Sequence, residues 1–229
     1  SHHVMAVDLY VRVGSLTLPN PVLVAAGTFG YGVEFRRTVR IEQLGGLVTK
    51  TLTRLPRAGN PPPRLVETPS GMLNSVGLQN PGFEVFLREI LPDMKTLGVP
   101  LIVSILGEST DEVASMVKPL DQADGVAAIE LNLSCPNLNT NAECGMRNAE
   151  LEEPFRIPNS EFPTRLMVAQ DPASTSAVVR AARSQTRKPL IAKLSPDVTD
   201  ITVIAQAAEQ AGAAAVVVSA LNALMVGIL

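Results

Sequence analysis

Apolar runs of strand length alternate with helical segments along most of this chain, and this alternation constrains the fold more than any other feature. The runs are nearly continuous in Val, Ile, Leu and Ala, as expected of strands buried on both faces. They lie at residues 22–26, 46–49, 101–105, 127–133, 190–194 and 214–218. Buried strands separated by helices predict an α/β fold in which helices cover a parallel sheet.

Helical signals fall between most of these runs. A capping box, in which a hydroxyl and a glutamate three residues later satisfy the first amides, precedes 113–120, and an Asp-Pro pair opens a helix over 171–182. An amphipathic segment at 200–211 ends at Gly212. A fourth helix is indicated by an apolar stripe at helical spacing, made of Phe83, Phe86, Leu87, Ile90 and Met94.

Small or reactive residues stand at the carboxyl ends of five successive runs. They are Gly27 with Thr28, Lys50 with Thr51, Ser104, Asn132 with Cys135, and Lys193. This placement is typical of a TIM (β/α)8 barrel, whose active site lies on that face. An open doubly wound sheet would favour a GxGxxG turn, and residues 27–32 lack that spacing. The sequence therefore predicts a TIM barrel, with about six of its eight strands present.

Composition limits the classes of partner. The chain has 229 residues, of which 46% are hydrophobic, so residues 6–229 can form a single domain after a tag-like stretch at 1–5. A net charge of −3 without basic clusters gives no reason to expect nucleic acid. No apolar run approaches ~20 residues, so no membrane span is expected. Both histidines lie in the tag-like stretch, which excludes histidine catalysis.

The two cysteines, Cys135 and Cys144, have no CxxC spacing. We therefore expect no disulfide scaffold, no metal site and a reducing cytoplasm. Cys135 follows a buried strand that Pro136 ends, and amides flank it on both sides. Such a thiol suits removal of a proton from carbon if another group accepts the electrons. The alternative is a buried structural thiol, and Cys144 is interpreted as incidental.

Two lysines and one long segment suggest how a ligand is held. Lys50 and Lys193 end apolar strands, where an ammonium would stabilise negative charge on a bound ring such as a reduced flavin; surface lysines are the alternative. Residues 51–80 show no regular pattern, and a loop of that length in a compact domain is usually functional. Its Asn74 and Asn80 offer donors and acceptors suited to an imide or urea group.

Taken together, these residues and their neighbouring motifs resemble those of the dihydroorotate dehydrogenases, specifically class 1, subtype B. A cysteine after the strand at 127–133 marks class 1, where class 2 carries serine. The resemblance implies a TIM barrel that oxidises dihydroorotate to orotate with FMN, in de novo pyrimidine biosynthesis. The motifs that carry the resemblance are residues 26–30, 49–51, 60–64, 70–74, 77–82, 132–137 and 193–201.

The resemblance also implies residue roles. Cys135 would remove the C5 proton while hydride leaves C6 for FMN, and Lys50 would contact substrate and flavin together. Substrate would be bound by Lys50, Asn74, Gly77, Leu78, Asn132 and Asn137. FMN would be lined by Ala26, Gly27, Lys50, Thr51, Ser104, Asn132 and Lys193, and by Ser219, which takes the register of a ligand-binding pair in the family.

Subtype B enzymes work with an FAD and iron–sulfur partner chain that passes electrons to NAD, so a homodimer or heterotetramer is implied. Residues 139–169 have no counterpart in the family pattern, and two further strands would follow Leu229 there. Six strands cannot close an eight-stranded barrel, so we expect residues 1–229 alone to bind flavin weakly. The alternatives are a dihydropyrimidine dehydrogenase-type flavin domain, which shares the Asn-Leu-Ser-Cys-Pro stretch, and a truncated homologue without catalytic activity.

Overall fold

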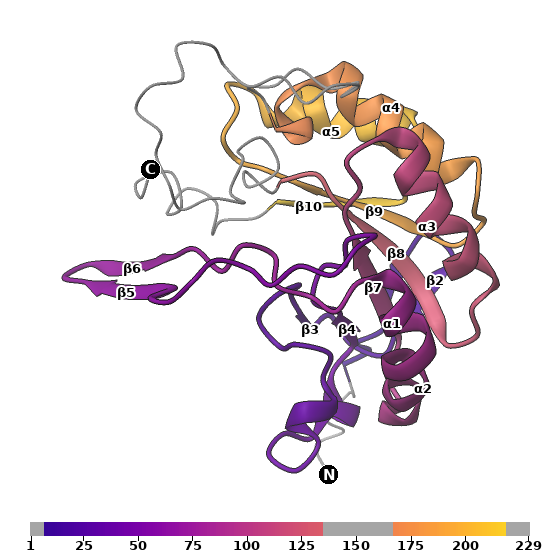
Figure 1. Cartoon of the computed structure of the whole chain (residues 1–229). Coiled ribbons are helices and arrows are strands. Elements are labelled where there is room, and N and C mark those ends of the chain that lie inside the picture. The colour runs from indigo at the N-terminus through magenta and orange to yellow at the C-terminus, as the bar shows by residue number, and fades with distance from the viewer. Residues whose placement is uncertain (1–6, 135–166, 219–229) are drawn as a thin grey trace, which may run out of the picture.

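The computed structural model describes residues 7–134 and 167–218, and within them a parallel six-stranded sheet forms half of a barrel (Figure 1). Its order, β10-β9-β8-β7-β4-β3, follows the chain without reversal, as a barrel requires and a doubly wound sheet does not. The strands are β3 (Leu23–Val24), β4 (Gly46–Val48), β7 (Leu101–Ile105), β8 (Val126–Asn132), β9 (Leu190–Leu194) and β10 (Ala215–Val218).

These six strands coincide with the six predicted runs. β7 and β9 have the predicted bounds, whereas β3 is shorter than the run at 22–26. The chain leaves the sheet there in a turn, in which the Thr28 amide donates to the Ala25 carbonyl at 3.2 Å. The prediction of a barrel-type sheet is confirmed.

Helices α3 (Thr110–Gln122), α4 (Pro172–Arg183) and α5 (Ile201–Gln210) lie together on the outer face of the sheet (Figure 1). The predicted N-cap residues cap the first turns of α3 and α4. The Ser109 hydroxyl accepts from the Glu112 amide at 3.1 Å, and the Asp171 carboxylate accepts from the Ser174 amide at 2.7 Å. Short 3-10 turns, η1 (Val33–Phe35), η2 (Ile41–Gln43) and η6 (Val168–Gln170), complete the connections.

The fourth predicted helix is a composite. It runs through α1 (Phe83–Val85), a π-helical turn η3 (Phe86–Ile90), α2 (Leu91–Met94) and a 3-10 turn η4 (Lys95–Leu97). Pro92 explains the wide turn before it, because in a regular helix its ring would clash with the carbonyl of Arg88. The predicted stripe nevertheless faces the core: Phe83, Phe86 and Met94 are fully buried.

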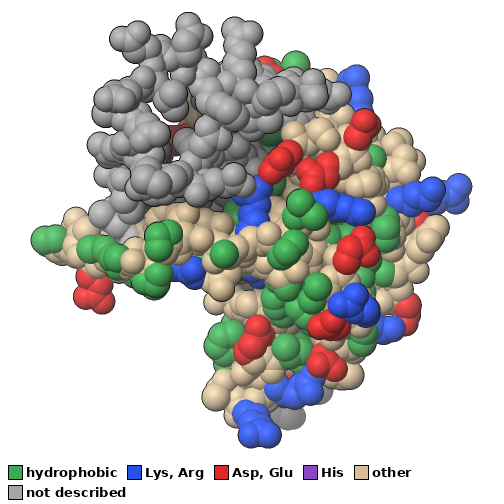
Figure 2. Space-filling model, in the orientation of Figure 1, with side chains coloured by type: hydrophobic (Ala, Val, Ile, Leu, Met, Phe, Trp, Pro, Cys, Tyr) green, Lys and Arg blue, Asp and Glu red, His purple; other side chains and the backbone are tan. Residues whose placement is uncertain are grey.

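Two antiparallel hairpins were not predicted. In β1 (Val11–Val13) and β2 (Leu16–Leu18), Val13 and Leu16 pack against the inner face of the sheet. The second hairpin, β5 (Leu65–Thr68) with β6 (Gly71–Asn74), projects from the body (Figure 1), so the prediction of an irregular 51–80 segment is wrong there. Leu65, Val66 and Met72 of this hairpin remain exposed, and Figure 2 shows apolar side chains on its surface, so no burial pattern marks these strands in the sequence.

Side chains on the two faces of the sheet form separate clusters. Outward-facing residues such as Leu131 join the large core beneath the helices, while an inner cluster contains Val48, Ile102, Ala128 and Ile191. The inner cluster is the apolar floor above which the strand-end residues stand. Among the described helices, none combines the length and the apolar character needed to cross a membrane.

Candidate functional site

The inner face of the sheet changes from apolar to polar toward the carboxyl ends of the strands. Two residues beyond the apolar floor, β7 carries Ser104, β8 carries Glu130 and β9 carries Lys193. Strand register places Ser104 beside Glu130 and Asn132 beside Lys193. Because side chains alternate between faces, these residues share the inner side with the floor.

Three of these side chains, together with Thr51, form one hydrogen-bonded series, which we call the polar row: Glu130, Ser104, Thr51 and Asn132. The Ser104 hydroxyl lies 2.8 Å from Glu130 Oε1 and 3.0 Å from Thr51 Oγ1. Asn132 Nδ2 donates to Thr51 Oγ1 at 3.1 Å. All four residues are buried, so the structure brings together three predicted site residues from three strand ends and adds Glu130.

In the sequence, Glu130 is visible only as an acidic residue that interrupts the apolar run at 127–133. It is 3% exposed. Burial raises the pKa of Glu130 above its usual range, and the charge of Lys193 and the hydrogen bond from Ser104 oppose that rise. The sequence signal was an acidic residue two positions before Asn132, on the same face of a buried strand.

The raised pKa predicts a specific dependence of stability on pH. The folded state binds the Glu130 proton more tightly than the unfolded state, so this stabilisation is fully present below the unfolded pKa of 4.5. It is lost as the pH rises through the folded pKa. Glu130→Gln has no such loss, so its melting temperature should rise relative to the wild type between about pH 4 and pH 8. Thermal unfolding at both pH values checks this; a difference that is constant with pH would contradict it.

The turn after β3 places backbone next to Lys50. Gly27 has φ +84°, and a Cβ added there would lie 3.7 Å from Lys50 Nζ. Glycine thus allows the left-handed conformation and presents backbone without a side chain close to the ammonium. Ala26 packs against the inner cluster, and the Lys50 amide donates to the Gly30 carbonyl at 2.8 Å. These contacts hold the turn against the carboxyl end of β4.

The loop after β6 contains two consecutive residues with positive φ, Gly77 at +72° and Leu78 at +55°. Leu78 is buried against Leu106, just beyond β7, so the loop reaches the polar edge of the sheet. A left-handed conformation at leucine costs energy and is concentrated at functional sites. Asn74 lies at the base of the hairpin, paired with Leu65.

Asn80 does not have the predicted ligand-binding character. Its Oδ1 accepts from the amides of Thr53 and Gly82, and its Nδ2 donates to Thr53 Oγ1 and the Leu78 carbonyl. These four bonds use the whole hydrogen-bonding capacity of the side-chain amide. Asn80 therefore fixes the loop, and the prediction that it offers a free amide to a ligand is wrong.

Gly77→Ala should distort this loop. The added Cβ would lie 2.7 Å from the Asn60 amide nitrogen, and alanine at φ +72° is strained. Strain of about 1–3 kcal/mol at the loop should weaken binding of orotate, the ligand that the family resemblance implies, roughly 5- to 150-fold. Gly98→Ala is the matched control, since φ is also +72° but its Cβ would meet nothing within 4 Å. Equal orotate dissociation constants for the two variants would contradict the assignment.

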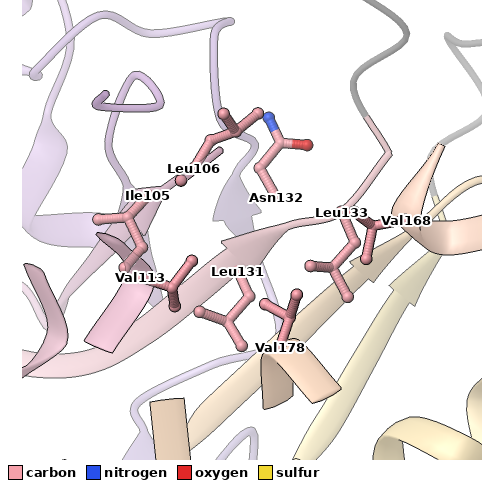
Figure 3. A pocket seen from close by; sticks show the side chains of 9 residues that line it. Ile105, Leu106, Val113, Leu131, Asn132, Leu133, Val168 and Val178 are labelled. Carbon is pink, nitrogen blue, oxygen red and sulfur yellow. The ribbon is translucent and has the colours of Figure 1, made fainter. Parts of the chain in front are cut away.

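The cavity in Figure 3 is a separate feature on the outer side of the sheet. It has a volume of about 10 Å³, room for roughly one water molecule. A flavin or pyrimidine ring cannot enter it, so the candidate site is the inner polar edge. The cavity is lined by Ile105, Leu106, Gly107, Val113, Leu131, Asn132, Leu133, Val168 and Val178.

Several predicted features fall outside the described residues: Cys135, Asn137, Ser219, the tag-like stretch at 1–5 and positions 139–166 of the unusual segment. The first described stretch ends at Ser134, whose amide and hydroxyl donate to Asn132 Oδ1 at 3.3 and 3.2 Å. The last residue before Cys135 is therefore bonded to the polar row.

Comparisons with known proteins match this chain to dihydroorotate dehydrogenases. The family model for dihydroorotate dehydrogenase matches residues 8–228. The chain is 45% identical over 225 residues to "Dihydroorotate dehydrogenase B (NAD(+)), catalytic subunit" of Desulforudis audaxviator, covering 98% of this chain and 66% of that protein. The same-named protein of Trichlorobacter lovleyi is 44% identical over 203 residues, covering 89% of this chain and 59% of that one.

A crystal structure of DHODH from Eimeria tenella, in complex with ferulenol, matches with a TM-score of 0.63 and 19% identity. It covers 91% of this chain and 58% of the other. At this identity the match concerns the fold. The chain spans about three fifths to two thirds of the length of the curated relatives it matches.

Proposed function

The chain belongs to the dihydroorotate dehydrogenase family, and we propose that it oxidises dihydroorotate to orotate with FMN as cofactor, in de novo pyrimidine biosynthesis. The observation that carries the proposal is the inner polar edge, where Lys50, the polar row and Lys193 stand at the ends of adjacent strands. A planar, electron-accepting ring bound at this edge would face hydrogen-bond donors and positive charge along one side.

The described residues fit FMN. Gly27 brings backbone without a side chain close to the Lys50 ammonium, so a flat ring could pack against the backbone beside that charge. Ammonium, amide and hydroxyl groups on one edge match the carbonyl oxygens and nitrogens of a flavin pyrimidine ring. Residues Ala26, Gly27, Lys50, Thr51, Ser104, Asn132, Lys193 and Ser219 would hold the cofactor.

When bound, FMN supplies the acceptor for the hydride that leaves C6 of dihydroorotate. The protein's own task is to take the C5 proton, and we assign this to Cys135, since both histidines lie at positions 2 and 3. Lys50, Asn74, Asn132, Asn137 and the Gly77–Leu78 backbone would bind the ring and carboxylate of the substrate. Removal of the proton and the hydride leaves the C5–C6 double bond of orotate.

The relatives are named as catalytic subunits of an NAD(+) enzyme. We propose that the electrons leave this chain through a partner subunit carrying FAD and an iron–sulfur cluster, within a homodimer or heterotetramer. Copurification with such a subunit, and NAD reduction only when it is present, would support this assembly. Turnover with NAD by the catalytic chain alone would contradict it.

The test of function is anaerobic mixing of the FMN-loaded protein with dihydroorotate, and separately with dihydrouracil. Loss of the yellow absorbance of oxidised flavin with dihydroorotate alone supports the proposal. Bleaching by dihydrouracil alone would instead favour a dihydropyrimidine dehydrogenase-type domain. A protein that stays yellow with both substrates is a relative without catalytic activity.

A further inference from the structure

Glu130 is a buried carboxylate that the family resemblance leaves without a role. It stands on the inner face of β8, level with Ser104 of β7 and two residues before Asn132, which pairs with Lys193. At 3% exposure it has lost nearly all contact with water. A buried acid that only filled space would be replaced at little cost by an apolar side chain of similar volume. Its position among proposed flavin-binding residues suggests another reason for a charge at this point.

When Glu130 is ionised, the donor and the acceptor of each hydrogen bond in the polar row are fixed. A carboxylate only accepts, so the Ser104 hydroxyl donates to Glu130 and must accept from Thr51. Thr51 has then used its single proton and accepts from Asn132 Nδ2. Asn132 Oδ1 meanwhile accepts from Ser134. The orientation of the Asn132 amide is thus fixed from both ends, and one of its N–H groups remains for a ligand.

The second effect of Glu130 is on Lys193. The two side chains belong to neighbouring strands and share the inner face, and their opposite charges attract. Lys193 is the residue we assign to the pyrimidine edge of the flavin. A negative charge beneath it offsets part of the positive potential that the ammonium exerts on the ring. It also draws the ammonium toward the strand instead of toward the ligand.

We propose that Glu130 is a positioning residue of the flavin pocket: it fixes the direction of the polar row and moderates, through Lys193, how strongly the pocket stabilises negative charge on the ring. The inference rests on the proposed function. It predicts that removing the charge makes the bound flavin easier to reduce, because reduced flavin carries negative charge near its pyrimidine edge. Both effects of the substitution, loss of the opposing charge and release of Lys193, act in the same direction.

The experiment measures the midpoint potential of bound FMN at about pH 8, together with the FMN dissociation constant from fluorescence. Glu130→Gln keeps an acceptor for Ser104 and removes the charge, and its potential should be more positive than that of the wild type. Glu130→Met removes both the charge and the acceptor of Ser104, fills the buried space with an apolar side chain, and should shift the potential the same way, which covers the case where the glutamine variant does not fold. Glu209→Gln, the same change on the exposed side of α5, is the control and should not shift it.

The outcomes separate this inference from the proposed function. Wild-type protein that binds FMN, with a positive shift in either neutral variant and none in Glu209→Gln, supports the role of Glu130. Wild-type FMN binding with potentials unchanged or more negative in the neutral variants overturns that role and leaves the proposed function standing. A wild-type protein that binds no FMN overturns both. A purely structural Glu130 would change the melting temperature and leave the potential where it is.

Discussion

Cys135→Ser is expected to slow reduction of bound FMN by dihydroorotate by about 10²- to 10⁴-fold at neutral pH, the usual contribution of a positioned general base. A free thiol has a pKa of about 8.5, so a useful fraction can be deprotonated near neutrality. A serine hydroxyl is a far weaker acid, and both histidines lie at positions 2 and 3. Because hydroxide can partly replace the base, the defect should become smaller as the pH rises. Stopped-flow mixing under anaerobic conditions measures this rate.

Cys144→Ser is the matched control, since it makes the same chemical change at the other cysteine. We expect it to reduce FMN at the wild-type rate. Both variants should retain flavin, because the proposed cofactor contacts come from other residues. Wild-type rates in Cys135→Ser at neutral pH would remove the thiol from the mechanism, and a defect in Cys144→Ser alone would move the role to that residue.

The sheet could be predicted because its strands are buried on both faces. Each leaves a nearly continuous apolar run in the sequence, and the observed bounds of β7 and β9 match the predicted ones. The β5–β6 hairpin has no such apolar run. In β5 and β6, Leu65, Val66 and Met72 are 46–58% exposed, so no alternation between buried and exposed positions identifies the strands. The β5–β6 hairpin was therefore missed because backbone pairing, and not burial of these side chains, holds its strands together.

The same contrast applies to the candidate site. Residues at strand ends, such as Lys50, Ser104 and Asn132, were predicted because the carboxyl ends of parallel strands meet at one edge. Asn80 was misjudged because its partners, among them Thr53 and Gly82, are brought to it only by the fold. Glu130 was visible as an acid in an apolar strand. Its bond to Ser104, however, depends on the register between β7 and β8, which the sequence does not reveal.

Lys50→Ala should weaken orotate binding and make the bound FMN harder to reduce. Its ammonium lies close to the Gly27 backbone at the carboxyl end of β3. A hydrogen bond to a charged group contributes about 1.5–3 kcal/mol, so the loss should be roughly 10- to 100-fold in orotate affinity. Lys118→Ala removes the same charge from an exposed position of α3 and should change neither quantity. Orotate titration and a spectroelectrochemical measurement test both effects.

The sign of the potential shift distinguishes an electrostatic pocket from a merely disturbed one. Removing the positive charge of Lys50 should make the potential more negative, whereas removing the negative charge of Glu130 should make it more positive. General loosening of the inner edge would change both variants in the same direction. Opposite shifts, with Lys118→Ala and Glu209→Gln unchanged, therefore require that each side chain acts on the ring through its charge. Positive shifts in both variants would contradict the assignment of Lys50 as a residue that contacts the flavin, and negative shifts in both would overturn the role of Glu130.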